Sequence, residues 1–503
     1  MTDAPLRMVA VDLGAESGRA IVGIFDGGRL ALEDVHRFPN VPVTLAGTLH
    51  WDFLRLFGEV TAGLRRAAAG GPVASVGVDT WGVDFGLLDV RGRLLANPVH
   101  YRDRRTEGMP DDAFAIVPRD EIYAATGIQF MPINTLYQLL SMVRAGDPLL
   151  GQADRLLMMA DLFHHFLAGS AVAEYTNAST SQCLDPVARD WARPLLARFG
   201  IPTGILPPIV APGTVLGPLR PDVAADTGLG DARVVAPGSH DTASAVVGAP
   251  LAGPTTAFLS SGTWSLIGLE VAAPVVSDVT LAANLTNEGG VAGTIRLLRN
   301  VMGLWLVQES RRALWPAGDA PSYEELTALA ETAPAFTAFI DPDDERLLRP
   351  GDLPARVRAI CAETGQPVPP DAGTLVRVLL ESLALRYAVA VDELTGASGH
   401  PIEAIHVVGG GSNHRLLCRL TAGATGLPVR AGPVEATAIG NLAVQAIAAG
   451  ELANVAEARA LIARSFPVTS HEPSGDWAEA RVRFGALLAA RRPPSQASAS
   501  TAP

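Results

Sequence analysis

The chain of 503 residues is 48% apolar and 18% charged, a composition typical of a globular protein with two or three domains. Its formal net charge of −13 argues against nucleic acids and anionic membranes as partners, because binding to many phosphates needs an excess of surface cations. All 39 basic residues are arginine. This argues against a Walker-type nucleotide site, a protein kinase fold and Schiff-base chemistry, since each relies on a lysine amine.

The first residues, the apolar runs and the cysteines bear on the cellular compartment of the protein. The first residues lack the basic flank and apolar segment of a signal peptide, and no apolar run approaches the length of a membrane span. Cys183, Cys361 and Cys418 have no metal-ligand spacing, so we expect reduced thiols in the core. The sequence therefore predicts a cytoplasmic protein.

The first strong pattern is a hairpin at 9–23, where two apolar runs flank a turn that carries Asp12, Ser17 and two glycines. Gly14 and Gly18 would permit positive φ angles and close approach, so that successive amides could point inward and bind phosphate. The alternative is an ordinary hairpin in which Asp12 caps its own turn. A second copy of the pattern would favour the phosphate site.

The next residues predict a mixed sheet. Residues 30–38 extend the hairpin by a third strand, and 51–69 have the apolar spacing of an amphipathic helix that ends at the glycines and proline of 70–72. The nearly continuous apolar run 73–79 is typical of a strand that is buried on both faces and reached by a helical crossover.

Several polar segments of the first half are candidates for a ligand pocket. Residues 79–85 place two acids and a tryptophan at the carboxyl end of a strand, where open α/β sheets bind ligands. Residues 100–106 suit a polyhydroxylated ligand, although they could equally form a solvated charged surface. The loop 174–180 could line a pocket, whereas His164 and His165 are expected to be core or surface residues.

The segment 233–247 is predicted to run from a strand into a helix. Ser239 or Asp241 could simply cap this helix. Asp241 also lies just upstream of a second glycine turn, and this position favours a catalytic role. The small residues and prolines of 249–254 predict the domain boundary.

The second copy of the hairpin lies at 257–268, and Thr263 aligns with Ser17 at a separation close to half the chain length. Two such hairpins predict a duplicated domain whose halves hold one nucleotide phosphate chain between them. A strand at 405–408 then runs into a triple-glycine turn and a helix, an arrangement that suits a flat ligand and a phosphate group.

Together, D-x-G-x-x-S-G at 12–18, S-H-D-T at 239–242, S-S-G-T-W at 260–264 and V-V-G-G-G at 407–411 resemble the FGGY family of carbohydrate kinases. The resemblance implies an α/β fold of duplicated actin-like (ribonuclease H-like) nucleotide-binding domains, with two lobes around a central cleft. The expected parts are a lobe over 1–250 with the sugar site and first phosphate hairpin, a lobe over 251–490 with the second phosphate hairpin and adenosine site, and a disordered tail over 491–503.

The resemblance also implies the chemistry. Within the family, D-T-W-G-V-D-F at 79–85, N-E-G-G at 287–290 and N-x-M-G-L-W-L at 300–306 are similar to strings in bacterial kinases that phosphorylate O1 of L-rhamnulose with ATP and Mg²⁺. Asp241 would be the general base, and Asp12 would hold Mg²⁺ through water. ATP would be bound by Ala15, Glu16, Ser17, Gly18, Arg19, Thr263, Gln308 and Gly410, and the sugar by Gly82, His240, Asp241, Thr242 and Asn300.

Two other functions share these features. A kinase for another ketose or deoxysugar would keep the fold, because pocket residues decide the choice of sugar. An actin-like switch ATPase would keep both hairpins, although the polar segments between them favour a sugar pocket. The expected partners are ATP and a small sugar, and the expected assembly is a monomer or a homodimer.

Overall fold

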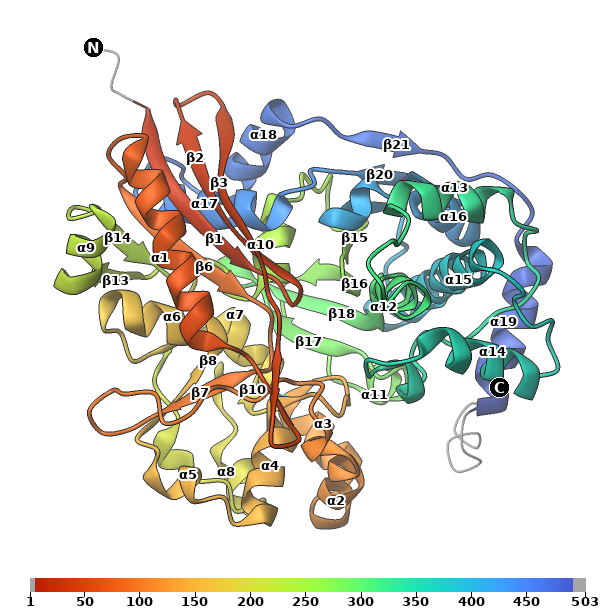
Figure 1. Cartoon of the computed structure of the whole chain (residues 1–503), viewed down its shortest axis with the longest axis horizontal. Coiled ribbons are helices and arrows are strands. Elements are labelled where there is room, and N and C mark those ends of the chain that lie inside the picture. Colours follow the sequence, from red (N-terminus) through yellow and green to blue (C-terminus); the bar gives the residue numbers. More distant parts are fainter. Residues whose placement is uncertain (1–4, 492–503) are drawn as a thin grey trace.

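The computed structural model describes residues 5–491, so all but the first residue of the predicted tail at 491–503 lies outside the described residues. Two large mixed sheets, one from each half of the chain, form the centre of the molecule (Figure 1). Within residues 5–491, no helix combines the length and the hydropathy needed to cross a bilayer.

The first sheet runs in spatial order through β13 (Val215–Pro218), β14 (Arg233–Val235), β6 (Ser75–Thr80), β1 (Leu6–Leu13), β2 (Ser17–Phe25) and β3 (Leu30–Pro39). Strand β1 is antiparallel to β2 and parallel to β6, while β3 is antiparallel to β2 and β14 is parallel to β6. Helix α1 (Phe53–Ala69) connects the antiparallel part to β6 and buries Leu56, Val60 and Leu64 at helical spacing. The predicted three strands, helix and parallel strand are confirmed.

The second sheet runs through β17 (Thr286–Gly289), β18 (Ile295–Met302), β16 (Trp264–Val271), β15 (Thr256–Ser261), β19 (Ala404–Val408), β20 (Val429–Ala431) and β21 (Thr469–His471). Strand β15 is antiparallel to β16 and parallel to β19, β16 is antiparallel to β18, and β19 is parallel to β20. The order β18-β16-β15-β19-β20 thus repeats β3-β2-β1-β6-β14 with the same strand directions. This repeat confirms the predicted duplication.

The first half carries a long insertion between β6 and β14, which lies below the first sheet in Figure 1. Much of it packs around a separate apolar core that includes Tyr137, Trp191 and Leu196. A short hairpin before α1 is formed by β4 (Val43–Leu45) and β5 (Thr48–His50). The insertion itself contains β7 (Phe85–Leu88), α2 (Met109–Ile116), α3 (Arg119–Thr126), α4 (Thr135–Ala145), α5 (Pro148–Gln152), β8 (Arg155–Met158), α6 (Met159–Ala168), β9 (Ala173–Glu174), α7 (Tyr175–Ala178), β10 (Leu184–Asp185), β11 (Asp190–Trp191), α8 (Arg193–Arg198), β12 (Ile209–Val210) and α9 (Pro221–Thr227).

In the second half, a group of helices packs beside the second sheet (Figure 1). The longest of them, α15 (Ala372–Ser398), is mostly buried, as the apolar run of its sequence predicts. The others are α11 (Asp278–Ala282), α12 (Trp305–Leu314), α13 (Tyr323–Thr332), α14 (Leu353–Glu363), α16 (Arg415–Thr425) and α19 (Ala478–Arg491). Helix α18 (Val455–Ser465) lies instead against the first sheet, where Leu461 and Ile462 share an apolar core with Ile21 and Phe25.

Two helices join the halves. In each half a helix follows the second parallel strand, α10 (Asp241–Gly248) after β14 and α17 (Ala436–Ala448) after β20. A Cβ on Gly440 would lie 1.8 Å from the carbonyl oxygen of Ser244, and one on Gly248 would lie 2.0 Å from that of Ala436. The helix backbones therefore touch, and only glycine fits at these two positions.

We expect Gly440→Ala to destabilise the protein by about 2 kcal/mol, because the added methyl group meets backbone atoms that cannot move aside as a side chain would. The matched control is Gly485→Ala in α19, where a Cβ meets nothing within 4 Å and the higher helix propensity of alanine should leave stability equal or higher. Thermal unfolding of both variants measures the difference. Equal midpoints for the two would show that the α10–α17 contact can relax.

Candidate active site

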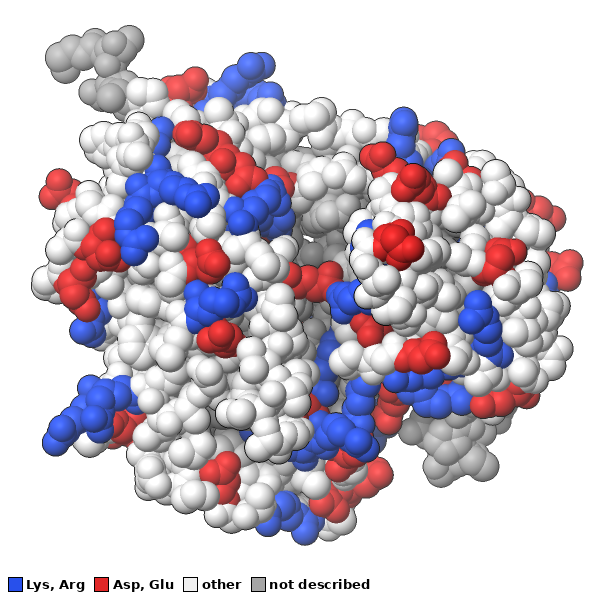
Figure 2. Space-filling view, in the orientation of Figure 1, with Lys and Arg blue, Asp and Glu red and all other residues white. Residues whose placement is uncertain are grey.

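A cavity of about 280 Å³ lies between the two halves, and Figure 2 shows a hollow between them on one face of the molecule. Both glycine hairpins reach this cavity, the first from the end of β1 and the second from the end of β15. The predicted site residues that line it are Asp12, Ala15, Glu16, Ser17, Arg19, Gly82, His240, Asp241, Thr242, Thr263, Asn300, Gln308 and Gly410.

Gly18 differs from the other predicted site residues, because it is not part of the cavity lining. A Cβ on it would lie 2.3 Å from the ring of Phe38 and 2.8 Å from Leu13, so its backbone packs against the core. The positive φ angles expected for Gly14 and Gly18 are wrong, since neither residue has one. Close packing behind the turn therefore explains the glycine at 18.

The first turn is held in place by Asn40, which follows β3. The turn closes with a hydrogen bond from Gly14 N to Ser17 O at 2.9 Å. Asn40 donates its side-chain amide to Gly14 O at 2.9 Å and its backbone N–H to Glu16 O at 2.8 Å. These bonds fix the loop that presents Ala15, Glu16 and Ser17 to the cavity.

The second turn is packed against the triple-glycine turn. Gly262 N donates to Trp264 O at 2.8 Å to close the hairpin. A Cβ on Gly411 would lie 2.0 Å from Ser261 Oγ, and Gly409 has a φ of 78°, so glycine is needed at both places. This packing brings the turn after β19, with Gly410, to the same end of the cavity as Thr263.

Arg19 connects the two halves beside the first turn. It donates to Asp12 Oδ2 from Nε at 2.8 Å and from Nη2 at 2.6 Å, and its Nη1 lies 3.1 Å from Glu435 Oε2, just before α17. Burial raises the pKa of Asp12, Arg19 lowers it, and Asp241 raises it further. Asp79, which is level with Asp12 on the neighbouring strand, also has its pKa raised by burial and by Asp12. The three carboxylates thus repel one another.

A second network surrounds the proposed base. Asp241 is the first residue of α10, and its Oδ1 accepts from Thr242 N at 2.5 Å. His240 Nε2 lies 3.4 Å from Asp241 Oδ1, and His240 Nδ1 lies 3.3 Å from Glu288 Oε2, which belongs to the other half. Glu288 in turn pairs with the fully buried Arg296 at 3.2 Å. The side chain of His240 therefore lies between carboxylates from both halves.

Glu288 is a cavity residue that the sequence-based site prediction missed, although it stands in the N-E-G-G string. Burial acts to raise its pKa, but Arg296 and His240 lower it by more, so the carboxylate is held ionised. Beside it, Asn300 N donates to Gln129 Oε1 at 2.8 Å and Gln129 Nε2 donates to Asn300 O at 3.1 Å. Gln129 also lines the cavity and joins the halves at this end.

Among residues 100–106, for which a polyhydroxylated ligand and a solvated charged surface were both open, Tyr101 lines the cavity and the arginines do not. Arg102 is buried, with its guanidinium 4.0 Å from the ring centre of Trp305, and it donates to the carbonyl of Leu348. Arg105 donates to Gln138 at 2.7 Å. Arg102 thus ties this segment to the second half of the chain, and Arg105 ties it to helix α4.

Comparison with known proteins gives matches over both halves. Residues 7–248 match the N-terminal domain and residues 257–449 match the C-terminal domain of the FGGY family of carbohydrate kinases. The chain is 45% identical over 478 residues to a rhamnulokinase from Bacteroides thetaiotaomicron, covering 94% of this chain and 98% of that protein. It is 43% identical over 486 residues to a rhamnulokinase from Pectobacterium carotovorum, covering 96% of each.

Solved structures share the fold at low sequence identity. Gluconate kinase from Lactobacillus acidophilus matches with a TM-score of 0.78 and 17% identity, over 98% of this chain and 99% of that one. Glycerol kinase from Plasmodium falciparum with ADP matches with a TM-score of 0.75 and 15% identity, over 97% and 98%. These matches confirm the predicted fold, and the two domain matches together establish that this chain belongs to the FGGY family of carbohydrate kinases.

Proposed function

We propose that this chain transfers the γ-phosphoryl group of ATP to O1 of L-rhamnulose, a step in the breakdown of L-rhamnose. The observation that carries the proposal is a single cavity lined by both glycine turns and by Asp241. The choice of sugar rests on the relatives named rhamnulokinase, which are 41–45% identical over nearly the whole chain.

ATP fits the end of the cavity formed by the two turns. The amides of the first turn and the hydroxyls of Ser17 and Thr263 can donate to phosphate oxygens. Arg19 is the cation at this end, and it takes the place that a lysine has in other nucleotide sites. Gln308 and Gly410 would contact the rest of the nucleotide.

The residues at this end also fit Mg²⁺. Asp241 raises the pKa of both Asp12 and Asp79, and a buried oxygen of Asp79 lacks a hydrogen-bond partner, so a bound cation would relieve the repulsion. Among residues 5–491, no three acid, histidine or cysteine side chains form a metal cluster of their own. Asp12 would hold Mg²⁺ through water, and the cation would supply positive charge that neutralises the transferred group.

The sugar fits the other end, beside Gly82, His240, Thr242 and Asn300. A Cβ on Gly82 would lie 2.8 Å from Thr180 Oγ1, so glycine allows Gly82 and Thr180 to pack closely in this wall. The O1 hydroxyl is a poor nucleophile at neutral pH, and Asp241 would accept its proton as O1 attacks the γ-phosphorus. The O1–P bond forms while the bond to the β,γ-bridging oxygen breaks, and ADP leaves. Because this transition state is loose, placement of the two substrates matters more than a strong base.

The proposed location is the cytoplasm. Cys183, Cys361 and Cys418 are buried and free, as predicted, and unpaired thiols are typical of a reducing compartment. Assembly as a monomer or homodimer stays a prediction.

The choice of substrate is tested by release of ADP from the purified protein with a panel of ketoses. We expect turnover to depend on sugar and to be fastest with L-rhamnulose, because the pocket residues, and not the fold, select the sugar. Faster turnover with another ketose would assign that sugar instead. Equal ADP release with and without sugar would favour the switch ATPase.

We expect Asp241→Asn to lower kcat at least ~10²-fold, the scale of general-base catalysis, while the KM values for sugar and ATP stay within a few fold. An amide of the same shape still accepts from Thr242 but cannot take the O1 proton. The control is Asp222→Asn, an exposed acid in α9 that should leave both constants unchanged. Near-normal turnover of Asp241→Asn would remove this residue from its role.

A further inference from the structure

Asp84 is a buried carboxylate close to the sugar end of the cavity. It follows β6 and directly precedes β7, and its side chain has no exposed surface. Its Oδ2 accepts from Trp51 Nε1 at 2.6 Å, from Trp81 Nε1 at 3.1 Å and from the backbone N–H of Tyr101 at 3.2 Å. Its Oδ1 accepts from Gln138 Nε2 at 2.8 Å. One carboxylate thus gathers donors from four separate segments.

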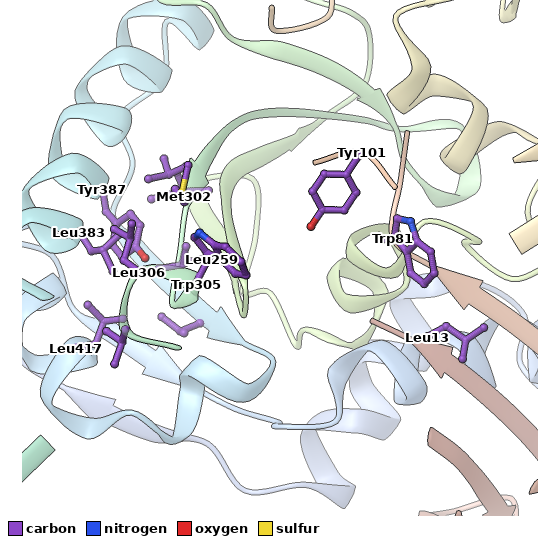
Figure 3. Packing of buried hydrophobic residues seen from close by; sticks show 14 of the residues in the cluster. Leu13, Trp81, Tyr101, Leu259, Met302, Trp305, Leu306, Leu383, Tyr387 and Leu417 are labelled. Carbon is purple, nitrogen blue, oxygen red and sulfur yellow. The ribbon is translucent and has the colours of Figure 1, made fainter. Parts of the chain in front are cut away.

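Two of these donors belong to the cavity wall. Trp81 and Tyr101 both line the cavity, and Figure 3 shows them near each other, across from the cluster that contains Trp305. Trp51 packs behind them, with its ring centre 4.1 Å from that of Trp81. The hydroxyl of Tyr101 accepts from Trp264 Nε1 at 3.2 Å, so this wall also touches the second hairpin.

An ionised carboxylate at this buried position lowers the stability of the fold. Burial raises the pKa of Asp84 to about 6, although its hydrogen bonds to Trp51, Gln138 and Trp81 act to lower it. Ionised groups are rarely kept in a dry interior unless they hold other groups in a required geometry. The residues that Asp84 holds are aromatic side chains, whose faces pack well against the C–H groups of a sugar ring.

We propose that Asp84 is a positioning residue for the acceptor sugar: it fixes Trp81 and Tyr101 as one wall of the pocket and thereby sets the affinity for the ketose. This inference rests on the proposed function, because it assigns the wall to the sugar. Asp84 accepts from Trp51, Trp81, Tyr101 and Gln138, none of which is assigned to ATP, so the KM for ATP should depend on Asp84 far less than the KM for the ketose.

The test is steady-state kinetics of Asp84→Asn with the ketose and with ATP varied in turn. We expect the KM for the ketose to rise about tenfold or more, since small displacements of a substrate-positioning group have effects of this size. The KM for ATP should stay within twofold. Glu381→Gln, which neutralises a buried carboxylate in α15 away from the cavity, is the control for a purely structural loss.

Trp81→Phe provides an independent variant, because it keeps a ring at this position but removes the N–H that Asp84 accepts. If Asp84 acts through Trp81, the double variant should raise the ketose KM by less than the product of the two single effects. This variant also tests the proposal if Asp84→Asn does not fold, and an unchanged ketose KM in Trp81→Phe would then overturn it.

Other outcomes would overturn the proposal as well. These are an unchanged ketose KM in folded Asp84→Asn, equal rises in the KM for the ketose and the KM for ATP, or a change in the two KM values that matches the change in Glu381→Gln. The ketose that the wild-type protein phosphorylates tests the proposed function separately from this inference. If it uses a different ketose, the assignment of L-rhamnulose fails, and the same comparison with that ketose still decides the role of Asp84.

Discussion

The backbone contact between α10 and α17 is the constraint on which the site depends. No side chain separates Ser244 from Gly440, so the two helices have a fixed spacing. Both helices begin at the cavity, α10 at Asp241 and α17 just after Glu435. One contact therefore sets where each half presents a helix N-terminus, and the partial positive charge of these ends favours an anionic ligand between them.

The charges of the cavity explain how an acidic protein can suit a nucleotide. The net charge of −13 argues against partners that need a wide cationic surface, but a triphosphate needs only a few local donors. Arg19 supplies a cation, yet it is already shared between Asp12 and Glu435. A bare triphosphate would be repelled by these acids, and a divalent cation bound to it would reduce this repulsion. The acids are therefore consistent with the proposal that ATP binds together with Mg²⁺.

The sequence could predict the features that depend on residues close together along the chain. Apolar runs around glycine turns identify both hairpins, and their separation predicts the duplicated fold. Contacts between distant segments could not be predicted in this way. The burial of Arg102 depends on Trp305, and the role of Glu288 depends on His240. Gly18 illustrates the same limit, because the ring of Phe38 leaves no room for a Cβ there, and this contact between strands is not evident from the sequence.

Buried carboxylates around the proposed sugar end of the cavity are a further sign of functional constraint. Besides Asp84, Glu174 is fully buried, and its Oε2 accepts from the backbone N–H of Ser239 at 3.0 Å, directly before His240 and Asp241. Burial raises the pKa of Glu174 to about 7 and that of Asp84 to about 6. As the pH rises from the ordinary pKa of each group to these values, the unfolded chain loses the protons first, so folding becomes less favourable.

At neutral pH both groups therefore cost stability, and apolar or amide side chains would fold more favourably in their places. Each group holds a segment that lines the cavity: Asp84 holds Trp81 and Tyr101, and Glu174 holds the turn that carries Asp241. A protein selected for stability alone would not keep such groups. Their position behind two segments that line one cavity is best explained if the placement of the acceptor and of the proposed base limits the reaction, as expected for phosphoryl transfer through a loose transition state.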